Sequence, residues 1–426
     1  MKQKLYKILI PALCAILIFA GCTTQQTSTS SSGTSSDAAV YDSQSDSNDT
    51  EVKNVSTQST ASDDFSDVFS DRDISGDYDE ETFTIRLNGT SATSSADTVS
   101  ISGSTVTITG AGTYIISGSW SNGSIIVNAG EDDKVQLVLS GVTINSDNYA
   151  AIYVKQADKV FITLADSTEN TLSNGGSFTQ TDDNNVDAVI FSKDDITFNG
   201  TGTLKITSPA GHGIVGKDDV TITSGTYDIT AANHAISAND LIAVAGGAFT
   251  LSAGKDGLHS ENSDDETLGN IYIADGTFTI KVSDDAIHAN TMLQIDSGTF
   301  DITAAEGLEG TYIRINGGTI DISASDDGIN AANKSSAYTA TVEINDGEIT
   351  IEMGSGDTDG VDSNGNIVIN SGTIDITGNS SFDCDGTAEY NGGTIIVNGQ
   401  QVDSIPNQMM GGGMGGMGGM GRMHQF

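Results

Sequence analysis

The stretch Ser-Gly-Thr-Phe-Asp-Ile-Thr at residues 297–303 recurs with small changes at 224–230, 317–323 and 371–377. Looser copies are centred on glycines in between, at Gly247, Gly276, Gly347 and Gly393. Successive glycines of the repeat therefore lie 22, 29, 22, 20, 29, 25 and 21 residues apart. A repeat of this length predicts a solenoid, in which each unit packs only against its neighbours.

Within each unit the apolar residues alternate over three to five positions. Leu293 and Ile295, and then Phe300 and Ile302, show the two-residue period of a β-strand. Gly, Asn, Asp and Ser fill the joints between such runs. A leucine-rich horseshoe would need a Leu-x-x-Leu-x-Leu scaffold and usually helices. The pattern therefore predicts an all-β solenoid, a single parallel β-helix with about three short strands per coil and coils stacked about 4.8 Å apart.

The ends of the chain differ from this body in composition. Residues 1–22 combine a lysine-rich start, an apolar run and the ending Phe-Ala-Gly-Cys, which predicts a lipoprotein signal peptide and a lipid on Cys22. Residues 23–80 are rich in Ser, Thr and Asp, and we expect a disordered stalk there. The β-helix is expected at 81–405, followed by a flexible Gly/Met-rich tail at 406–426. This organisation predicts an extracellular lipoprotein, anchored at the cell surface only through its lipid.

Acidic residues dominate the charge of the chain. Asp and Glu number 58 and Lys and Arg number 17, which gives a formal net charge of −41 at pH 7. Such a charge repels nucleic acid and anionic membrane surfaces, so neither is expected as a partner. Cations are the expected partners.

A second phrase runs in the same register as the repeat: an acidic residue or His, then a small residue, then an aliphatic one. Equivalent residues of successive coils in a β-helix stack about 4.8 Å apart, so the acids of this phrase would form a column. The column acids are Asp256, Asp285, Glu306, Asp327 and Asp359. Further acids flank them in sequence at Asp284, Asp326, Asp357, Glu309 and Asp362.

A column of stacked carboxylates predicts bound cations. Two unit charges about 5 Å apart repel by about 3 kcal/mol at an effective dielectric of 20. Calcium would relieve this repulsion, because it accepts roughly 6–8 oxygen ligands in flexible geometry. We therefore predict that these ten acids bind calcium. The alternative is that they only form turns, by accepting bonds from backbone N–H groups; it explains a single Asp-Gly better than the doubled acids, and we favour calcium.

Two histidines follow the acidic column by three residues. They are His259 and His288, and Glu309, Asn330 and Asp362 have the same place in later coils. The histidines could bind a metal or form hydrogen bonds along the stack. Zinc sites need three or four close nitrogen or sulfur donors, whereas this set is mostly oxygen. We therefore favour hydrogen bonding over metal ligation for the two histidines.

Several short motifs support a family resemblance. They are Gly110-Ala111-Gly112-Thr113-Tyr114, Ser140-Gly141-Val142-Thr143-Ile144, Ala151-Ile152-Tyr153, Glu169-Asn170-Thr171-Leu172, Gly211-His212-Gly213-Ile214 and Asp284-Asp285-Ala286-Ile287-His288. With these motifs, residues 100–400 resemble the clostridial family of extracellular right-handed β-helix proteins that bind cellulose and pectate. The resemblance implies right-handed coils similar to those of pectate lyases, calcium at the coil turns, and carbohydrate binding without demonstrated catalysis.

The function predicted from these features is non-catalytic binding of a plant-wall-type polysaccharide by a monomer at the cell surface. The ligand would be pectate or polygalacturonate, held by calcium bridges because so acidic a protein repels a polyanion. Cellulose is the other ligand considered. A neutral glucan would need aromatic platforms, and Trp120 and scattered tyrosines are the residues available for them.

Other functions stay open, and whether the protein is an enzyme is uncertain, with binding favoured. A calcium-dependent polysaccharide lyase would need a base, for which Arg314 is the candidate, although an ion pair is its expected role. Gly211-His212-Gly213 and Asp182-Asp183 suggest a polygalacturonase-like hydrolase, but the later Arg-x-Lys element of those enzymes is missing. A structural surface adhesin would fit the stalk and the anchor equally well.

Overall fold

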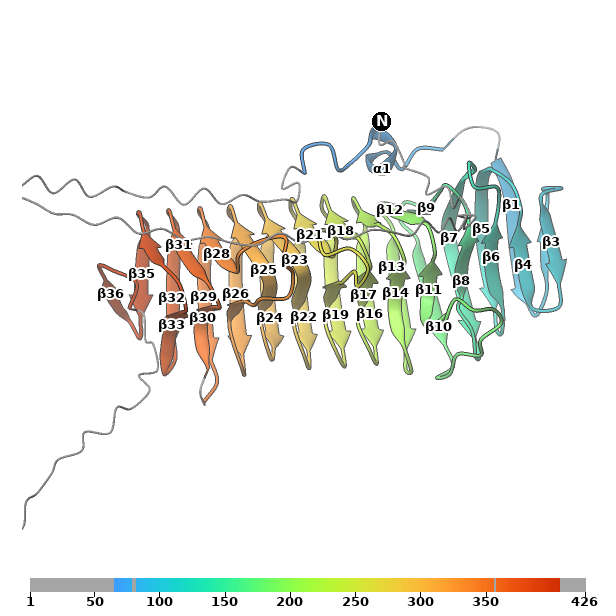
Figure 1. Cartoon of the computed structure of the whole chain (residues 1–426). Coiled ribbons are helices and arrows are strands. Elements are labelled where there is room, and N and C mark those ends of the chain that lie inside the picture. The colour runs from blue at the N-terminus through green and yellow to red at the C-terminus, as the bar shows by residue number, and fades with distance from the viewer. Residues whose placement is uncertain (1–64, 79–81, 356–357, 407–426) are drawn as a thin grey trace, which may run out of the picture. The chain divides into compact units, whose positions relative to one another are not determined.

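The computed structural model describes residues 65–78, 82–355 and 358–406. In this part of the chain nearly all residues of regular structure are in strands, and the strands join one continuous sheet (Figure 1). Most strands pair in parallel with the equivalent strand of the next coil. The prediction of an all-β parallel β-helix is therefore confirmed. The described residues contain no helix that is long and apolar enough to cross a membrane.

Three rows of parallel strands run along the stack of coils. The first row contains β10 (Glu169–Asn174), β13 (Thr203–Ser208), β16 (Thr226–Ala231), β19 (Ala248–Ala253), β22 (Thr277–Val282), β24 (Thr299–Ala304), β26 (Thr319–Ala324), β29 (Glu348–Met353), β32 (Thr373–Thr377) and β35 (Thr394–Val397). From β16 onward, each of these strands begins directly after the glycine of the repeated phrase. The second row contains β4 (Thr105–Ile108), β6 (Ser124–Asn128), β8 (Ile152–Gln156), β11 (Ala188–Ser192), β14 (His212–Gly216), β17 (Ile236–Ala238), β20 (Leu258–Ser260), β27 (Ile329–Ala331), β30 (Asp359–Ser363) and β33 (Ser380–Cys384). The third row contains β9 (Lys159–Leu164), β12 (Asp195–Gly200), β15 (Val220–Ile222), β18 (Leu241–Val244), β21 (Asn270–Ile273), β28 (Thr341–Ile344), β31 (Asn366–Ile369) and β34 (Ala388–Tyr390).

A few elements depart from this three-row plan. Two long strands pair with strands of both the second and third rows, β23 (Ile287–Ile295) and β25 (Leu308–Ile315). The N-terminal coils contain β1 (Thr82–Gly89), β2 (Ala92–Ser94), β3 (Val99–Ser102), β5 (Gly112–Trp120) and β7 (Lys134–Ser146). The last described strand is β36 (Gln400–Val402), and the described helix is α1 (Asp71–Ile74). β2, β3 and β36 each pair in antiparallel fashion with a neighbour, at the two ends of the stack.

The glycine of the repeated phrase has a backbone conformation that other residues rarely adopt. Its φ angle is positive in every copy, from +89° at Gly372 to +149° at Gly276. This left-handed region is open to glycine because it lacks a Cβ atom. A Cβ at Gly276 would also lie 2.7 Å from the ring of Phe278. The phrase therefore marks the turn that enters each strand of the first row from β16 onward.

The core is formed by side chains that stack from coil to coil. In β24 the residues alternate between exposed and buried, with Phe300 and Ile302 inside and Asp301 outside. The rings of Phe249, Phe278 and Phe300 stack with centroids 4.5 and 4.7 Å apart. These separations match the expected spacing of about 4.8 Å between coils. The same register sets the spacing of polar residues on the outside.

Residues 65–78 pack along the side of the stack, although they fall in the range where we expected a disordered stalk (Figure 1). Asp73 is 2% exposed and its Oδ1 lies 2.7 Å from Lys159 Nζ. Phe65 stacks on Tyr272, with ring centroids 4.7 Å apart. The folded body therefore begins before residue 81. The predicted signal peptide and the predicted tail lie outside the described residues, apart from residue 406.

Candidate metal-binding columns

The backbone aligns the predicted acids in one column at the start of the second row of strands. In each coil, the residue after the acid donates its N–H to the carbonyl of the acid in the next coil. Gly257 donates to Asp285 at 3.1 Å, and Gly307 donates to Asp327 at 3.0 Å. This first column runs through His212, His234, Asp256, Asp285, Glu306, Asp327 and Asp359. The predicted stacking of the five acids is therefore present.

A second column lies three residues further along each coil. His259 pairs in register with His288, and His288 with Glu309. The column continues through Asn330, Asp362 and Asp383. Both columns thus change in character along the stack, from histidine at one end to carboxylate at the other.

Three of the ten predicted calcium ligands fall outside the two columns. Asp284 and Asp326 each precede a first-column acid by one residue, and both are exposed. Asp357 lies outside the described residues. The seven others are in the columns, where neighbouring coils bring their carboxylates together.

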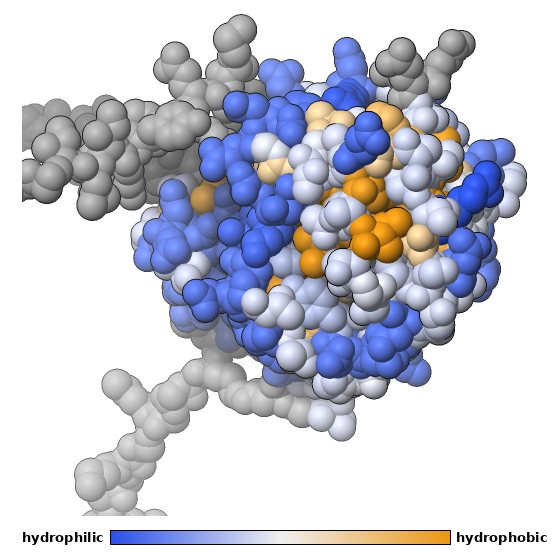
Figure 2. Space-filling model, turned by 90° about the vertical axis from the view of Figure 1, so that its right-hand side faces the viewer, coloured by the Kyte–Doolittle hydropathy of each residue, from blue (hydrophilic) through white to orange (hydrophobic). Residues whose placement is uncertain are grey.

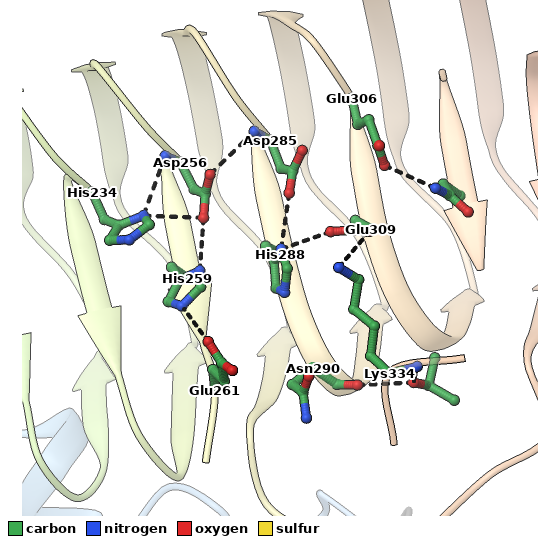
Figure 3. Close-up of polar contacts among 12 residues, drawn as sticks. His234, Asp256, His259, Glu261, Asp285, His288, Asn290, Glu306, Glu309 and Lys334 are labelled. Carbon is green, nitrogen blue, oxygen red and sulfur yellow. Dashed lines mark hydrogen bonds and ion pairs between the residues drawn. The ribbon is translucent and has the colours of Figure 1, made fainter. Parts of the chain in front are cut away.

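At the histidine end, two imidazoles face one carboxylate (Figure 3). Asp256 Oδ2 lies 3.0 Å from His234 Nδ1 and 2.7 Å from His259 Nδ1. Burial alone would raise the pKa of Asp256, but its close contacts with His234 and His259 hold that pKa well below its usual range. The rings of His212, His234 and His259 stack with centroids 5.0 and 4.1 Å apart. Burial lowers the pKa of His234, and it lowers that of His212 to about 3.

In the middle of the columns, one imidazole lies between two carboxylates. His288 Nδ1 is 2.8 Å from Asp285 Oδ2 and 2.7 Å from Glu309 Oε2, so this histidine does bond along the stack as predicted. Lys334 Nζ pairs with Glu309 Oε1 at 2.7 Å. Burial lowers the pKa of His288, but the two carboxylates outweigh burial and raise it to about 9. Burial, followed by Glu309 and Asp285, raises the pKa of Glu306 to about 8.

A hollow of about 400 Å³ opens over the histidine end and the middle of the columns. It is lined by His234, Lys255, Asp256, His259, Glu261, Asp284, Asp285, His288, Glu306, Glu309 and Lys334. Most of these side chains are charged or can be charged, so the hollow suits an ion or a charged group better than an apolar ligand.

At the other end of the columns, carboxylates face one another. Ligand oxygens of Asp359, Asp362 and Asp383 lie within 4.8 Å of one another. Burial, followed by the nearby carboxylates of Asp327 and Asp359, raises the pKa of Asp362 to about 7. A raised pKa of this kind is what like charges produce when they share a partly buried space.

Some of the column carboxylates also accept hydrogen bonds from backbone N–H groups. The N–H of Asp285 donates to Asp256 Oδ1 at 3.2 Å, and the N–H of Asp359 donates to Asp327 Oδ1 at 2.9 Å. The turn-forming role that we weighed against calcium is therefore present at two coils. Each carboxylate has a second oxygen, so this role and cation binding are compatible.

The sequence reasoning missed two groups of acids. Asp383 lies beside Asp362 in the next coil, but its coil lacks the Asp-Gly phrase that we followed. Asp195, Asp218 and Asp219 form a second cluster, with ligand oxygens within 4.8 Å of one another. A repeated Lys-Asp-Asp triplet, at the start of two successive third-row strands, is the signal that could have revealed it.

Two of the aromatic residues considered for stacking on a sugar are buried, and the arginine considered as a catalytic base is in an ion pair. Trp120 and Tyr153 are each 1% exposed, so neither can stack on a sugar, and the expectation that Trp120 offers a platform is wrong. Arg314 Nε lies 2.9 Å from Glu343 Oε2, and its Nη1 donates to Gln294 Oε1 at 3.2 Å. The ion pair expected for Arg314 is therefore present.

Three comparisons with known proteins found similar sequences and a similar structure. The family model of carbohydrate-binding domain-containing proteins matches residues 102–357 and 306–404. A carbohydrate-binding domain-containing protein of Acetivibrio thermocellus is 39% identical over 137 residues, which are 32% of this chain and 48% of that relative. The chain thus matches about half of the relative's length.

A solved structure is also similar. It is the polysaccharide lyase-like protein from C. thermocellum, in a gadolinium derivative, with 31% sequence identity and a TM-score of 0.50. The similarity covers 57% of this chain and 94% of the other. Because the family model spans more than half of the chain and both similar proteins are more than 30% identical over the matched regions, this chain belongs to the family of carbohydrate-binding domain-containing proteins.

Proposed function

We propose that this protein binds an acidic plant-wall-type polysaccharide, such as pectate, through calcium ions held by the carboxylate end of the two columns. The observation that supports the proposal most directly is the cluster of Asp359, Asp362 and Asp383, with Asp327 beside it. The family supports a carbohydrate ligand. Binding rather than turnover is proposed.

Calcium fits this cluster by charge and by ligand type. Three carboxylates whose oxygens lie within 4.8 Å repel one another, and this repulsion adds to burial in raising the pKa of Asp362. A divalent cation would relieve it. Calcium takes oxygen ligands at flexible geometry and retains positions for water or for a further ligand. The similar solved protein was obtained as a gadolinium derivative, and gadolinium is likewise a hard cation.

Calcium would also bring an acidic polysaccharide to this acidic surface. At a net charge of −41 the protein repels a polyanion, and the repulsion at contact reaches a few kcal/mol per charge pair. A calcium ion bound by protein carboxylates changes the local sign of the potential. Its remaining positions can then accept a uronate carboxylate.

A pull-down with insoluble pectate tests the proposal. We expect retention in millimolar calcium and loss of retention after a chelator is added. The variant Asp362→Asn with Asp383→Asn should lose calcium-dependent retention. Its control is Asp228→Asn with Asp375→Asn, which removes the same charge from outward positions of first-row strands and should retain pectate binding.

The outcomes separate the parts of this proposal. Retention that a chelator does not change would refute calcium bridging. Calcium binding without pectate retention would support the calcium site but would refute pectate as the ligand. Equal loss in both double variants would mean that overall charge, rather than the cluster, governs binding.

Cellulose is the second ligand that we propose, and one hollow in the structure offers a candidate binding site for it. A hollow of about 320 Å³ lies among polar side chains in the N-terminal half and includes the partly exposed Tyr149 with the amides of Asn122 and Asn148. Neutral sugars stack on such rings and hydrogen-bond to such amides. Retention on cellulose should therefore be unaffected by a chelator and should weaken in Tyr149→Ala.

The cell-surface location is part of the proposal and rests on residues outside the described part. We propose that Cys22 carries a lipid after cleavage of residues 1–21. Expression of Cys22→Ala should then release the protein from the membrane fraction. Unchanged membrane association of this variant would refute the lipid anchor.

A further inference from the structure

The histidine end of the columns brings two nitrogen donors and one oxygen donor to a single point. One ring nitrogen of His234, one ring nitrogen of His259 and a carboxylate oxygen of Asp256 all lie within 4.8 Å of one another. Asp256 Oδ2 is 3.0 Å from the first nitrogen and 2.7 Å from the second. His234 comes from one coil and Asp256 and His259 come from the next, and Figure 3 shows both rings directed at the carboxylate.

The hydrogen bonds at His234 do not account for this arrangement. The backbone N–H of Asp256 donates to His234 Nδ1 at 3.3 Å, and in this contact the nitrogen presents its lone pair. The same nitrogen lies 3.0 Å from Asp256 Oδ2, which also presents lone pairs. One ring nitrogen cannot accept a hydrogen bond and donate another. A cation between the lone pairs would resolve the conflict.

The surroundings of His259 provide a second, independent observation. Its other ring nitrogen, Nε2, lies 3.5 Å from Glu261 Oε2. A histidine that binds a metal through one nitrogen almost always donates its other N–H to a carboxylate or a carbonyl, which fixes the ring. His259 has this partner on the side away from Asp256.

We propose that His234 Nδ1, His259 Nδ1 and Asp256 Oδ2 bind a divalent transition-metal ion of the zinc class, at a site separate from the calcium proposed above. Zinc bonds of about 2.0–2.1 Å place tetrahedral ligand atoms about 3.4 Å apart. Asp256 Oδ2 is closer than this to both nitrogens, at 3.0 and 2.7 Å, so the carboxylate must move outward slightly to admit the ion. Three protein ligands leave a fourth position for water, and that position faces the hollow of about 400 Å³.

The choice of metal follows from the donors. Imidazole nitrogen suits zinc, nickel and copper, whereas calcium requires a cage of oxygens. The next coil does not offer the same site. There His288 Nδ1 is held by the carboxylates of Asp285 and Glu309, and Lys334 adds a positive charge at 2.7 Å from Glu309.

Equilibrium dialysis of the whole chain against Zn²⁺ in the presence of millimolar calcium tests the site. We expect one tightly bound zinc per chain that calcium does not displace. Cobalt serves as a spectroscopic substitute, because its visible absorption reports nitrogen ligation. His259→Asn should lower zinc affinity by on the order of 100-fold, and Glu261→Gln, which acts through His259, by about 10-fold.

Two control variants keep the test decisive. His288→Asn and the double variant Asp362→Asn with Asp383→Asn should both retain the tight zinc and its cobalt spectrum. Since Glu261 is exposed, Glu261→Gln should fold normally even where a histidine variant does not. The proposal is overturned if the chain binds no zinc under these conditions, or if the His259 and Glu261 variants bind it as tightly as the parent. It is also overturned if the control variants lose it. Pectate retention does not enter this test, so its outcome is independent of the proposed function.

Discussion

The two ends of the paired columns have the same backbone and opposite chemistry. At one end the side chains are imidazoles around Asp256, and at the other they are the carboxylates of Asp359, Asp362 and Asp383. In both, coil stacking sets the spacing, because the same ladder bonds hold each coil on the next. The fold thus provides a fixed row of positions, and the side chain at each position decides which ion it suits and how it responds to pH.

In the middle of the columns, positively charged side chains of the protein itself neutralise the carboxylates. His288 and Lys334 supply positive charge to Asp285 and Glu309 at distances of 2.7 to 2.8 Å. At the carboxylate end, burial and the neighbouring carboxylates instead raise the pKa of Asp362 to about 7. Cation dependence should therefore be concentrated at the carboxylate end.

The largest expected effect is that of calcium on thermal stability. A ligand that binds only the folded state at 100 times its dissociation constant stabilises it by about 2.7 kcal/mol per site. Adding millimolar calcium to chelated protein should therefore raise the melting midpoint by several degrees. Asp362→Asn with Asp383→Asn should abolish most of this rise, whereas His234→Asn should retain it. An unchanged midpoint in the parent protein would contradict a calcium site at this end.

The next effect is a pH dependence at the carboxylate end without calcium. Folding raises the pKa of Asp362 to about 7, so the folded state binds a proton that the unfolded state releases near pH 4. Its contribution to stability is present below that pH and is lost as the pH rises through 7. Asp362→Asn should therefore gain stability over the parent between pH 5 and pH 8, by on the order of 1 kcal/mol after solvent screening. Melting curves in a chelator at several pH values measure this, and a gain that shrinks with rising pH would contradict it.

The histidine end should respond to pH in the opposite direction. Burial lowers the pKa of His212 to about 3, so between pH 6.5 and pH 3 the unfolded state binds a proton that the folded state does not. Stability is therefore lost as the pH falls below 6.5. His212→Asn should remove this loss, and its melting midpoint relative to the parent should rise as the pH falls from 7 to 5. A difference that stays constant over this range would show that His212 is equally accessible to protons in both states.

The fold was predictable from sequence because successive coils need the same residue types at equivalent positions. From β16 onward, the turn before each first-row strand has a glycine with positive φ, and the core needs alternating apolar residues, so both leave a periodic trace. The two columns were predictable for the same reason, since stacking follows from the period.

What the sequence did not reveal depends on contacts outside the period. Asp383 was missed because its coil lacks the Asp-Gly phrase, although β33 pairs in register with β30. The packing of residues 65–78 was missed because a polar segment gives little apolar signal, and its attachment depends on single contacts such as that of Asp73 with Lys159. Trp120 gave no sign of its burial, since one aromatic residue has no period.

The smallest expected effect is that of Arg314 on any reaction with pectate. Arg314 is on β25, the strand that also contains Glu309, so it is the candidate base beside the columns. Burial lowers the pKa of its guanidinium, but the contacts with Glu343 and Tyr312 outweigh burial and raise it. A base must lose its proton to act, and this environment favours the protonated form. Incubation with pectate and calcium at alkaline pH should thus give no unsaturated uronate by ultraviolet absorbance, and Arg314→Gln should leave pectate retention unchanged. Steady calcium-dependent product formation that disappears in Arg314→Gln would instead show that the carboxylate half of the columns serves a lyase.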